Sequence, residues 1–536
     1  MGNHLKFNRP TSGQWSKYLI LIILLLGIGF RLVNIDKKVY WIDEAYTSLR
    51  ISGYTKAEII QEIDGRQINV KDLQQYQRPN DNKDVGDTIQ GLALHEPQHS
   101  PLYFVMAHFW AKLFGYSVTV MRSLPALISL LTLPCIYWLC LELFESPLTG
   151  WIAIALLCVS PFHVLYAQEA RQYSLWTLTT LLSSIALLRA MRLSTLMSWV
   201  IYGITVSLNL YSYLLSGLVF IGHGIYVFCI EKFRLSKQLV RYGLASLFGI
   251  IAFLPWLRLV IENGIELGDW ADKETPLGKL ITRWLINLSS VFFDIQIGYN
   301  NPLFDVRSGR DLKFSYDHLL IYFDILILII VGYSIYFIFR HSQQRVWLFI
   351  LTMIAVVGMF PIAQDLILGG QRSSMARYFI PCYLGIQLAV AYLLAKKINP
   401  LNGKTIKQQQ LWRLVAITVI SGGVLSCAIS SQAETWWHKY SNYYTPEEAH
   451  IINEANRPLV ISSDIMRLVS LSYLLDPKAT LQLIDTKDSP KVFSSFSDVF
   501  LYRPSPKLRQ KFEEESPYDV KPAHKRKHLW KLVLVR

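Results

Sequence analysis

Residues 18–46, YLILIILLLGIGFRLVNIDKKVYWIDEAY, decide how the rest of the chain is read. The first part, residues 18–35, is apolar and long enough to cross a bilayer as a helix. Asp43 and Glu44 follow it as two adjacent carboxylates. The stretch therefore predicts a membrane span with two acidic side chains near the point where the chain leaves the membrane.

The composition extends this interpretation to most of the chain. Of the 536 residues, 52% are hydrophobic and 17% are charged, and the mean hydropathy is +0.28. Long apolar runs recur, which is typical of a polytopic membrane protein. The net charge of +14 comes mostly from basic residues in short loops between apolar runs, so membrane topology explains it better than a nucleic-acid partner does.

The apolar runs predict about eleven membrane-spanning helices and a mainly α polytopic fold. The six cysteines lie within these runs without metal-ligand spacing, and we expect them to be buried thiols. The predicted spans cover residues 18–35, 118–144, 151–166, 175–188, 197–214, 218–230, 244–261, 319–339, 346–368, 379–395 and 414–429.

Lysines and arginines gather in alternate loops between these spans. Because such residues favour the cytoplasmic side, the N-terminus is expected in the cytoplasm, and the long polar loops 36–116 and 262–317 and the C-terminal tail outside. The basic residues that set this orientation are Arg189, Arg192, Lys232, Arg234, Lys237, Arg241, Arg340, Arg345, Lys396, Lys397, Lys404, Lys407 and Arg413.

The outside segments have patterns of their own. Residues 45–63, 101–114 and 277–293 predict helices lying along the membrane surface, since they are amphipathic or rich in aromatic residues. The polar stretch 64–91 is expected to be a mobile loop or lid. Residues 431–536 alternate short apolar runs with helical stretches, which predicts a small extracytoplasmic α/β domain.

The predicted topology gathers chemically active side chains at the outer face. They come from four separate parts of the chain: Asp43 and Glu44; His95, Glu96, His99 and Tyr103; Glu169, Arg171 and Tyr173; Arg372, Arg377 and Tyr378. Each has a structural alternative. Acidic residues favour helix N-termini, and arginines at a membrane surface often reach lipid headgroups.

Four motifs at these places resemble one family. They are Trp41-Ile42-Asp43-Glu44-Ala45-Tyr46; His99-Ser100-Pro101-Leu102-Tyr103; Ser160-Pro161-Phe162 with Gln168-Glu169-Ala170-Arg171-Gln172-Tyr173-Ser174-Leu175; and Arg377-Tyr378-Phe379 with Pro381. Over roughly the first 400 residues the chain is similar to the GT-C glycosyltransferases that use polyprenyl-phosphate sugars. That group includes protein O-mannosyltransferases (glycosyltransferase family 39), aminoarabinose transferases of lipid A and lipopolysaccharide-core glycosyltransferases.

One departure from the family pattern concerns a histidine. Many relatives have His-Pro-Pro where this chain has His99-Ser100-Pro101, and a second His-x-Pro lies at His95-Glu96-Pro97. Either histidine can hold the family role.

The resemblance implies that residues 1–430 form the catalytic domain and that the reaction is an inverting transfer of a sugar from a polyprenyl phosphate to a hydroxyl acceptor. Such a transfer needs a base for the acceptor proton and cations for the leaving phosphate. Asp43 is the expected general base, with Glu44 as a catalytic accessory that binds substrate or metal or caps the helix. The expected phosphate-binding residues are Arg171, Arg372, Arg377 and Tyr378; the expected substrate-binding residues are His99, Glu169, Tyr173 and Tyr103.

Several alternatives stay open at the level of sequence. A divalent metal at His95, Glu96 and His99 is one possibility, although no cofactor is required by the chemistry. A lipid or polysaccharide transporter or flippase would also contain many helices, and an O-antigen ligase or polymerase would use a diphosphate-linked glycan. By resemblance, the expected location is a bacterial plasma membrane, with membrane lipids and a lipid-linked donor, and no nucleic acid, as partners.

Overall fold

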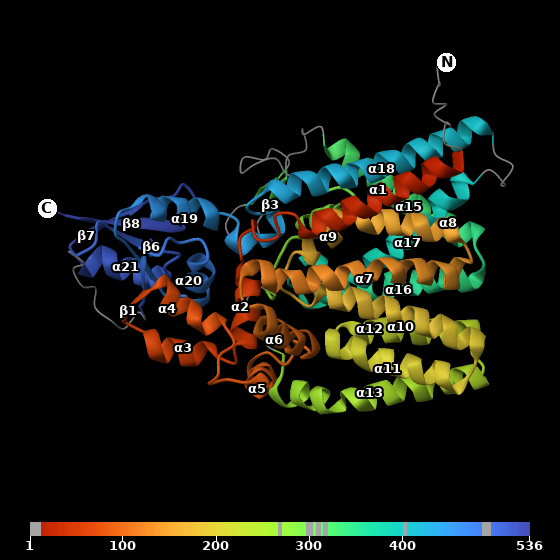
Figure 1. Ribbon diagram of the computed structural model, residues 1–536, viewed down its shortest axis with the longest axis horizontal. Coiled ribbons are helices and arrows are strands. Elements are labelled where there is room, and N and C mark those ends of the chain that lie inside the picture. The colour runs from red at the N-terminus through yellow and green to blue at the C-terminus, as the bar shows by residue number, and fades with distance from the viewer. Residues whose placement is uncertain are drawn as a thin grey trace, which may run out of the picture.

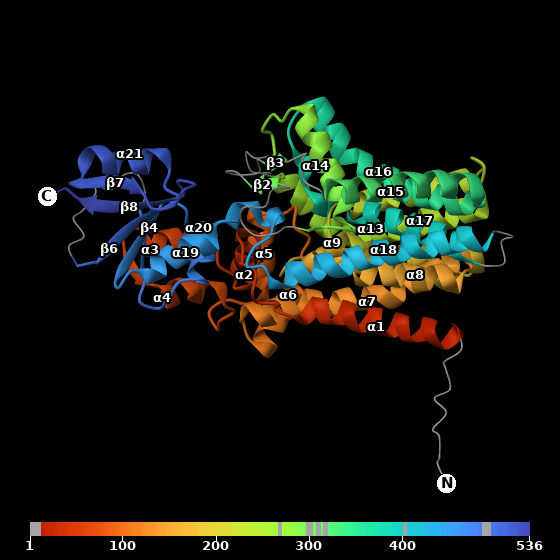
Figure 2. The same ribbon diagram turned by 90° about the horizontal axis from the view of Figure 1, so that it is seen from above.

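The chain forms a bundle of long helices with a small α/β domain at one end (Figure 1). The computed structural model describes residues 12–265, 271–295, 304–306, 312–314, 320–399, 405–484 and 495–535. Figure 2 shows the same division from above: the α/β domain lies beyond one end of the bundle. We call the end of the bundle that carries the α/β domain the domain end.

Every predicted span coincides with one helix or, for residues 151–166, with a bent pair. Seven described helices are long and apolar enough to cross a membrane, or eight if the bent pair counts as one span. The bundle helices are α1 (Ser12–Leu32), α7 (Val118–Phe144), α8 (Pro147–Cys158), α9 (Pro161–Ala167), α10 (Tyr173–Leu193), α11 (Leu196–Ser212), α12 (Ser216–Ile230), α13 (Lys237–Asn263), α15 (Ile321–His341), α16 (Gln344–Leu368), α17 (Ile380–Ile398) and α18 (Ile406–Gln432).

The bend between α8 and α9 brings part of the site to the domain end. The two helices meet at 60°. Ser160 caps α9, since its hydroxyl accepts a hydrogen bond from the His163 amide, and Pro161 takes a first-turn position where its missing N–H costs nothing. The short α9 ends at Ala167, just before the segment that carries Glu169 and Arg171.

The first long loop is mostly helical. Its elements are α2 (Ile42–Ile51), α3 (Lys56–Ile63), β1 (Gln67–Asn69), α4 (Val70–Gln74), the 3-10 helix η1 (Gln75–Gln77), α5 (Val85–His95) and α6 (Leu102–Phe114). The single helix expected over 45–63 is broken at Gly53, whose φ of 81° lies in the left-handed region that glycine favours. The loop expected over 64–91 contains regular structure, namely β1, α4, η1 and part of α5. Its role as a lid stays a prediction.

The second long loop is described only in part, because stretches of 262–317 lie outside the described residues. The surface helix predicted over 277–293 is present as α14 (Leu277–Ser289), and a hairpin of β2 (Phe304–Val306) and β3 (Leu312–Phe314) follows. Two 3-10 helices, η2 (Arg372–Ser374) and η3 (Ala376–Phe379), connect α16 to α17. A third, η5 (Trp437–Asn442), connects α18 to the α/β domain.

The α/β domain is built on one mixed sheet with strand order β1-β5-β4-β6-β8-β7. Strand β4 lies parallel to both β5 and β6, while β1, β7 and β8 pair antiparallel with their neighbours. The bounds are β4 (Pro458–Ser462), β5 (Thr480–Leu483), β6 (Asp498–Tyr502), β7 (Tyr518–Pro522), β8 (Leu529–Leu534), α19 (Thr445–Glu454), α20 (Ile465–Ser472) and α21 (Pro506–Glu515).

Alternate residues of β4 face two different cores. Val460 packs with residues of α3, α4, α19 and α20, whereas Leu459 and Ile461 pack with residues of α21. Because successive side chains of a strand point to opposite faces, helices cover both faces of the sheet. The first long loop therefore supplies one strand and part of one helical layer, so the predicted C-terminal α/β domain is completed by residues from the other end of the chain.

Candidate functional site

The site is centred on the first turn of α2 at the domain end of the bundle. Oδ2 of Asp43 lies 3.0 Å from Nη1 of Arg377. Arg171, from the turn before α10, donates from Nη1 to the Asp43 carbonyl oxygen at 3.1 Å and to Oγ1 of Thr47 at 3.2 Å. Three predicted residues from distant parts of the chain thus meet at one point.

Aromatic rings surround the Arg377 guanidinium. Its Cζ lies 5.7 Å from the ring centres of Trp41 and Tyr378 and 5.9 Å from that of Tyr173. Rings at this distance attract a cation through their negative faces, most strongly where water is excluded. The buried guanidinium is therefore held in place by its surroundings as well as by Asp43, and the predicted residues Tyr173 and Tyr378 belong to this setting.

His99 is the histidine that contacts the site. Its Nε2 lies 3.5 Å from Nη2 of Arg171, and its Nδ1 lies 3.3 Å from Nε2 of Gln172. Burial, followed by the Arg171 charge, lowers the pKa of His99 to about 4, so the imidazole is neutral near pH 7. The structure thus brings His99, not the exposed His95, into contact with Arg171.

Glu44 is in a different environment from its neighbour Asp43. Its side chain is 0% exposed, and Nε and Nη2 of Arg122 each donate to it at 2.7 Å. Lys439 Nζ at 3.1 Å, the Ala170 amide at 2.9 Å and the Trp41 amide at 3.4 Å also donate to it. Burial raises the pKa of Glu44, but Arg122 and Lys439 outweigh this effect and hold it below the usual range. Its carboxylate ties α2 to the bundle and is not among the residues that line the cavity. The expected cap of the helix is confirmed, since Glu44 accepts from the Trp41 amide in a capping box, and a catalytic role for Glu44 stays a prediction.

Glu169 has a similar supporting position. Its Oε1 lies 2.7 Å from Nε2 of His438 and 3.2 Å from Nζ of Lys439. Burial opposes ionisation, yet Lys439 and the His438 hydrogen bond lower the pKa of Glu169 to about 2. This carboxylate attaches η5 to the turn before α10 through Oε1, whereas Oε2 has no hydrogen-bond partner within the described chain. Its substrate-binding role stays a prediction.

Two other predicted residues lie away from the cavity. Arg372 pairs with Asp272, lies 3.7 Å from Oδ1 of Asp365 and donates to the Gly369 carbonyl at 3.0 Å. Two carboxylates thus already compensate its charge, which argues against the expected phosphate contact. Tyr103 is fully buried among core residues, and its hydroxyl has no hydrogen-bond partner within the described chain.

The candidate metal ligands do not converge. The described residues contain no group of three or more His, Cys, Asp or Glu side chains placed to hold a metal ion. Glu96 instead pairs with Arg50, with 3.1 Å between Oε2 and Nε, and His99 contacts Arg171.

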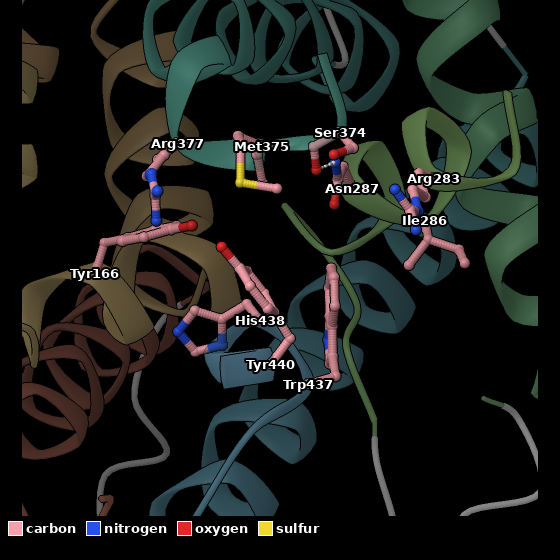
Figure 3. A pocket seen from close by; sticks show the side chains of 11 residues that line it. Tyr166, Arg283, Ile286, Asn287, Ser374, Met375, Arg377, Trp437, His438 and Tyr440 are labelled. Carbon is pink, nitrogen blue, oxygen red and sulfur yellow. Dashed lines mark hydrogen bonds between the residues drawn. The ribbon is translucent and has the colours of Figure 1, made fainter. Parts of the chain in front are cut away.

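A cavity of about 530 Å³, including its open mouth, adjoins Arg377. Figure 3 shows Arg377 and Tyr166 on one side of it, residues of η5 on a second and residues of α14 on a third. Asp43 is not among the lining residues and reaches the cavity through its contact with Arg377. The lining residues are Tyr166, Arg283, Ile286, Asn287, Ser374, Met375, Ala376, Arg377, Trp437, His438 and Tyr440.

Sequence reasoning missed the wall that η5 contributes. The run Trp436-Trp437-His438-Lys439-Tyr440 directly follows the last span, and so dense an aromatic and basic run at a membrane boundary is a usable signal. Both tryptophans donate to Asp294: Nε1 of Trp436 to Oδ2 at 2.7 Å and Nε1 of Trp437 to Oδ1 at 3.0 Å. These bonds fix η5 beside the cavity.

Comparisons with known proteins agree with this architecture. Residues 98–258, under a third of the chain, match the family model described as dolichyl-phosphate-mannose-protein mannosyltransferase. A search of curated protein sequences finds no match.

Among solved structures, apo ArnT from Cupriavidus metallidurans is similar over 97% of this chain and 98% of its own, with a TM-score of 0.53 and 10% identity. The same protein bound to undecaprenyl phosphate gives a TM-score of 0.47 at 13% identity, over 97% and 98% of the two chains. AglB from Archaeoglobus fulgidus, in complex with an inhibitory peptide and a dolichol-phosphate, gives 0.46 at 15% identity, over 87% of this chain and 65% of its own. Part of the chain therefore resembles this mannosyltransferase family, and the chain as a whole has the fold of ArnT.

Proposed function

We propose that the chain transfers a sugar from a polyprenyl phosphate to a hydroxyl acceptor, with Asp43 as the general base. The observation that carries this proposal is the contact between Asp43 and Arg377 at the wall of the cavity. It places a carboxylate and a buried guanidinium, the two groups that the reaction needs, within one ion pair.

Arg377 suits the donor phosphate because it lines the cavity and has a guanidinium held by three aromatic rings. A guanidinium presents parallel N–H donors that match phosphate oxygens. When a phosphate takes these donors, the Asp43 carboxylate loses its ionic partner. Donor binding would then free the base at the moment when it is needed. Arg171, which holds the Asp43 carbonyl, keeps the backbone in place during this exchange.

The chemical step needs one base. The acceptor oxygen bonds to the anomeric carbon while the bond from that carbon to the phosphate oxygen breaks. The phosphate leaves with the electron pair, and Asp43 accepts the hydroxyl proton. A single displacement of this kind inverts the anomeric configuration and needs no second, nucleophilic carboxylate. This agrees with the buried ion pair that Glu44 forms with Arg122.

The site is assigned to the outer face of a plasma membrane. Three of the basic residues, Arg192, Arg241 and Arg345, lie in the end turns of α10, α13 and α16, at helix ends remote from the α/β domain. Since such residues favour the cytoplasm, the domain end would face outward. A lipid-linked sugar would then enter from the outer leaflet and the acceptor from the aqueous side.

The test uses the purified full chain in liposomes that contain a panel of polyprenyl-phosphate sugars and, in parallel samples, polyprenyl-diphosphate-linked glycans. Mass spectrometry follows the release of polyprenyl phosphate and the glycosylated product formed with a cell-envelope extract. We expect turnover by the wild type and its loss in Asp43→Asn. Translocation of the lipid without cleavage of the sugar would instead identify a flippase. Consumption of only diphosphate-linked glycans would identify a ligase.

A further inference from the structure

A second pocket lies in the α/β domain, where β4 and β6 end. The chain turns from β4 into α20 on one face of the sheet and from β6 into α21 on the other face. Adjacent parallel strands whose connections leave in opposite directions form a crevice at their carboxyl ends, and ligands of open α/β sheets bind there. In this structure the crevice has a volume of about 970 Å³, including its open mouth.

The lining of this crevice is strongly basic. Four cationic side chains, Arg467, Arg503, Arg509 and Lys527, contribute to it together with His528. No carboxylate is among its lining residues, although Asp464, Glu448 and Glu513 pair with the three arginines from outside the lining. The remaining lining residues are Ser441, Pro504, Pro506 and Trp530. Several cations converging on one hollow create a positive potential that favours an anionic ligand.

Two of the cations are fixed in advance. The Arg503 side chain is only 10% exposed, and its Nη1 donates to the Ser441 carbonyl at 2.6 Å while Nη2 lies 3.5 Å from Oε2 of Glu448. The Arg509 guanidinium lies 4.8 Å from the Trp530 ring centre, and its Nε lies 3.3 Å from Oε1 of Glu513 in an exposed pair that a phosphate can replace. Guanidinium groups held in this way lose little side-chain freedom when they bind a ligand.

The other two cations can be redirected toward a ligand. The Lys527 ammonium has no ion-pair partner within the described part of the chain. Arg467 pairs with Asp464 at 3.2 Å, but both side chains are about one third exposed, and exposed pairs of this kind contribute at most about 1 kcal/mol. A phosphate dianion would compete successfully for both groups.

The crevice and the central cavity are lined by neighbouring residues of one segment. Ser441 lines the crevice, and the preceding residue, Tyr440, lines the cavity beside Arg377. Both belong to η5, so one short segment separates the two hollows. A saccharide anchored in the crevice by a phosphate would extend along η5 toward Asp43.

We propose that this crevice binds a phosphate-bearing saccharide, which serves as the acceptor. The cations of the crevice are the evidence for binding of the phosphate group. The role of the bound saccharide as acceptor rests on the proposed glycosyltransferase function.

Isothermal titration of the purified full chain in detergent tests the binding. The probes are glucose 1-phosphate, inorganic phosphate and glucose. Glucose 1-phosphate should bind, and binding should weaken by about tenfold or more in Arg509→Ala and in Lys527→Asn, because each loses a charge-assisted contact. Asparagine at position 527 suits the left-handed backbone there, with φ of 56°. The matched control is Lys521→Ala, an exposed β7 lysine outside the crevice lining, which should bind like the wild type.

Several outcomes would overturn the proposal. One is equal binding by the wild type and both crevice variants; another is equal binding of glucose and glucose 1-phosphate. A third outcome is that nanodiscs of phosphatidylglycerol, but not of phosphatidylcholine, abolish glucose 1-phosphate binding. The crevice would then bind anionic lipid headgroups, and the proposed acceptor role would be wrong. Undecaprenyl phosphate binding, measured in the same samples, should be unchanged in Arg509→Ala. Retained sugar-phosphate binding without any sugar transfer would refute the proposed function alone.

Discussion

Oδ2 of Asp43 lies 3.0 Å from Nη1 of Arg377, which joins the first turn of α2 to the segment that precedes α17. The Asp43 side chain is 21% exposed, so the carboxylate is accessible to a reactant without leaving its partner. A phosphate in the cavity would compete with Asp43 for the same guanidinium. Binding of the donor phosphate would therefore release the Asp43 carboxylate from Arg377.

Substituting Asp43 with asparagine should not weaken donor binding. A neutral amide competes less with phosphate for Arg377 than a carboxylate does, so the Kd for undecaprenyl phosphate should stay equal or fall several-fold. Microscale thermophoresis of the detergent-purified variant measures this. Asp36→Asn, which changes an exposed carboxylate in the same loop, serves as the control and should match the wild type. A Kd that rises in Asp43→Asn would argue against competition for Arg377.

Arg377→Ala and Arg372→Ala should differ sharply in donor affinity. Loss of the Arg377 contact should raise the Kd for undecaprenyl phosphate by about 10- to 100-fold, as expected for a charge-assisted hydrogen bond. Arg372 is already paired with Asp272 and Asp365, and its removal should change the Kd by no more than about twofold. The opposite ranking in the same binding assay would move the phosphate site to Arg372.

Glu44→Gln should lower the stability of the folded protein. Breaking a buried ion pair leaves an uncompensated charge and typically costs about 3–5 kcal/mol, here on Arg122 and Lys439. The midpoint of thermal unfolding in detergent should fall clearly. Glu145→Gln, at a side chain that is 72% exposed, should leave it unchanged. An unaltered midpoint combined with lost turnover would support a chemical role for Glu44.

Lys38 makes stability depend on pH near neutrality. Burial, followed by the charges of Lys439 and Arg122, lowers the pKa of Lys38 to about 7. Between this value and the unfolded value near 10.5, the unfolded chain binds more protons, so stability rises with pH in that window. Lys38→Met should therefore raise the unfolding midpoint most at pH 6 to 7, and the gain should shrink toward pH 10. A gain that does not vary with pH would show that Lys38 does not titrate there.

The sequence was a good guide to the bundle, because a membrane span is a local property of the chain. About twenty consecutive apolar residues must form a helix in lipid, whatever the rest of the protein does. Each predicted span accordingly coincides with a helix or with the bent pair α8 and α9. The α/β domain was predicted as well, but the addition of β1 was not. Its partner β5 lies about four hundred residues away, and pairing at that distance leaves no local pattern.

The roles of neighbouring residues in the site could not be predicted from the sequence alone. Asp43 and Glu44 are adjacent on α2, yet successive residues of a helix point about 100° apart, so one side chain reaches Arg377 and the other reaches Arg122. The family motif contains Arg377 and favours it slightly over Arg372, and the acidic partners of Arg372 are a stronger reason that only the fold supplies. Such differences depend on what folding brings nearby, which a list of candidate residues does not contain.

The most direct test of the central claim is a single-turnover measurement of sugar transfer from a polyprenyl-phosphate donor by wild type and Asp43→Asn, with donor binding shown to be saturated in both. The account predicts that Asp43→Asn binds the donor fully and transfers the sugar about 10²- to 10⁴-fold more slowly, which is the usual contribution of a general base. Transfer at the wild-type rate by the saturated Asp43→Asn protein would contradict it.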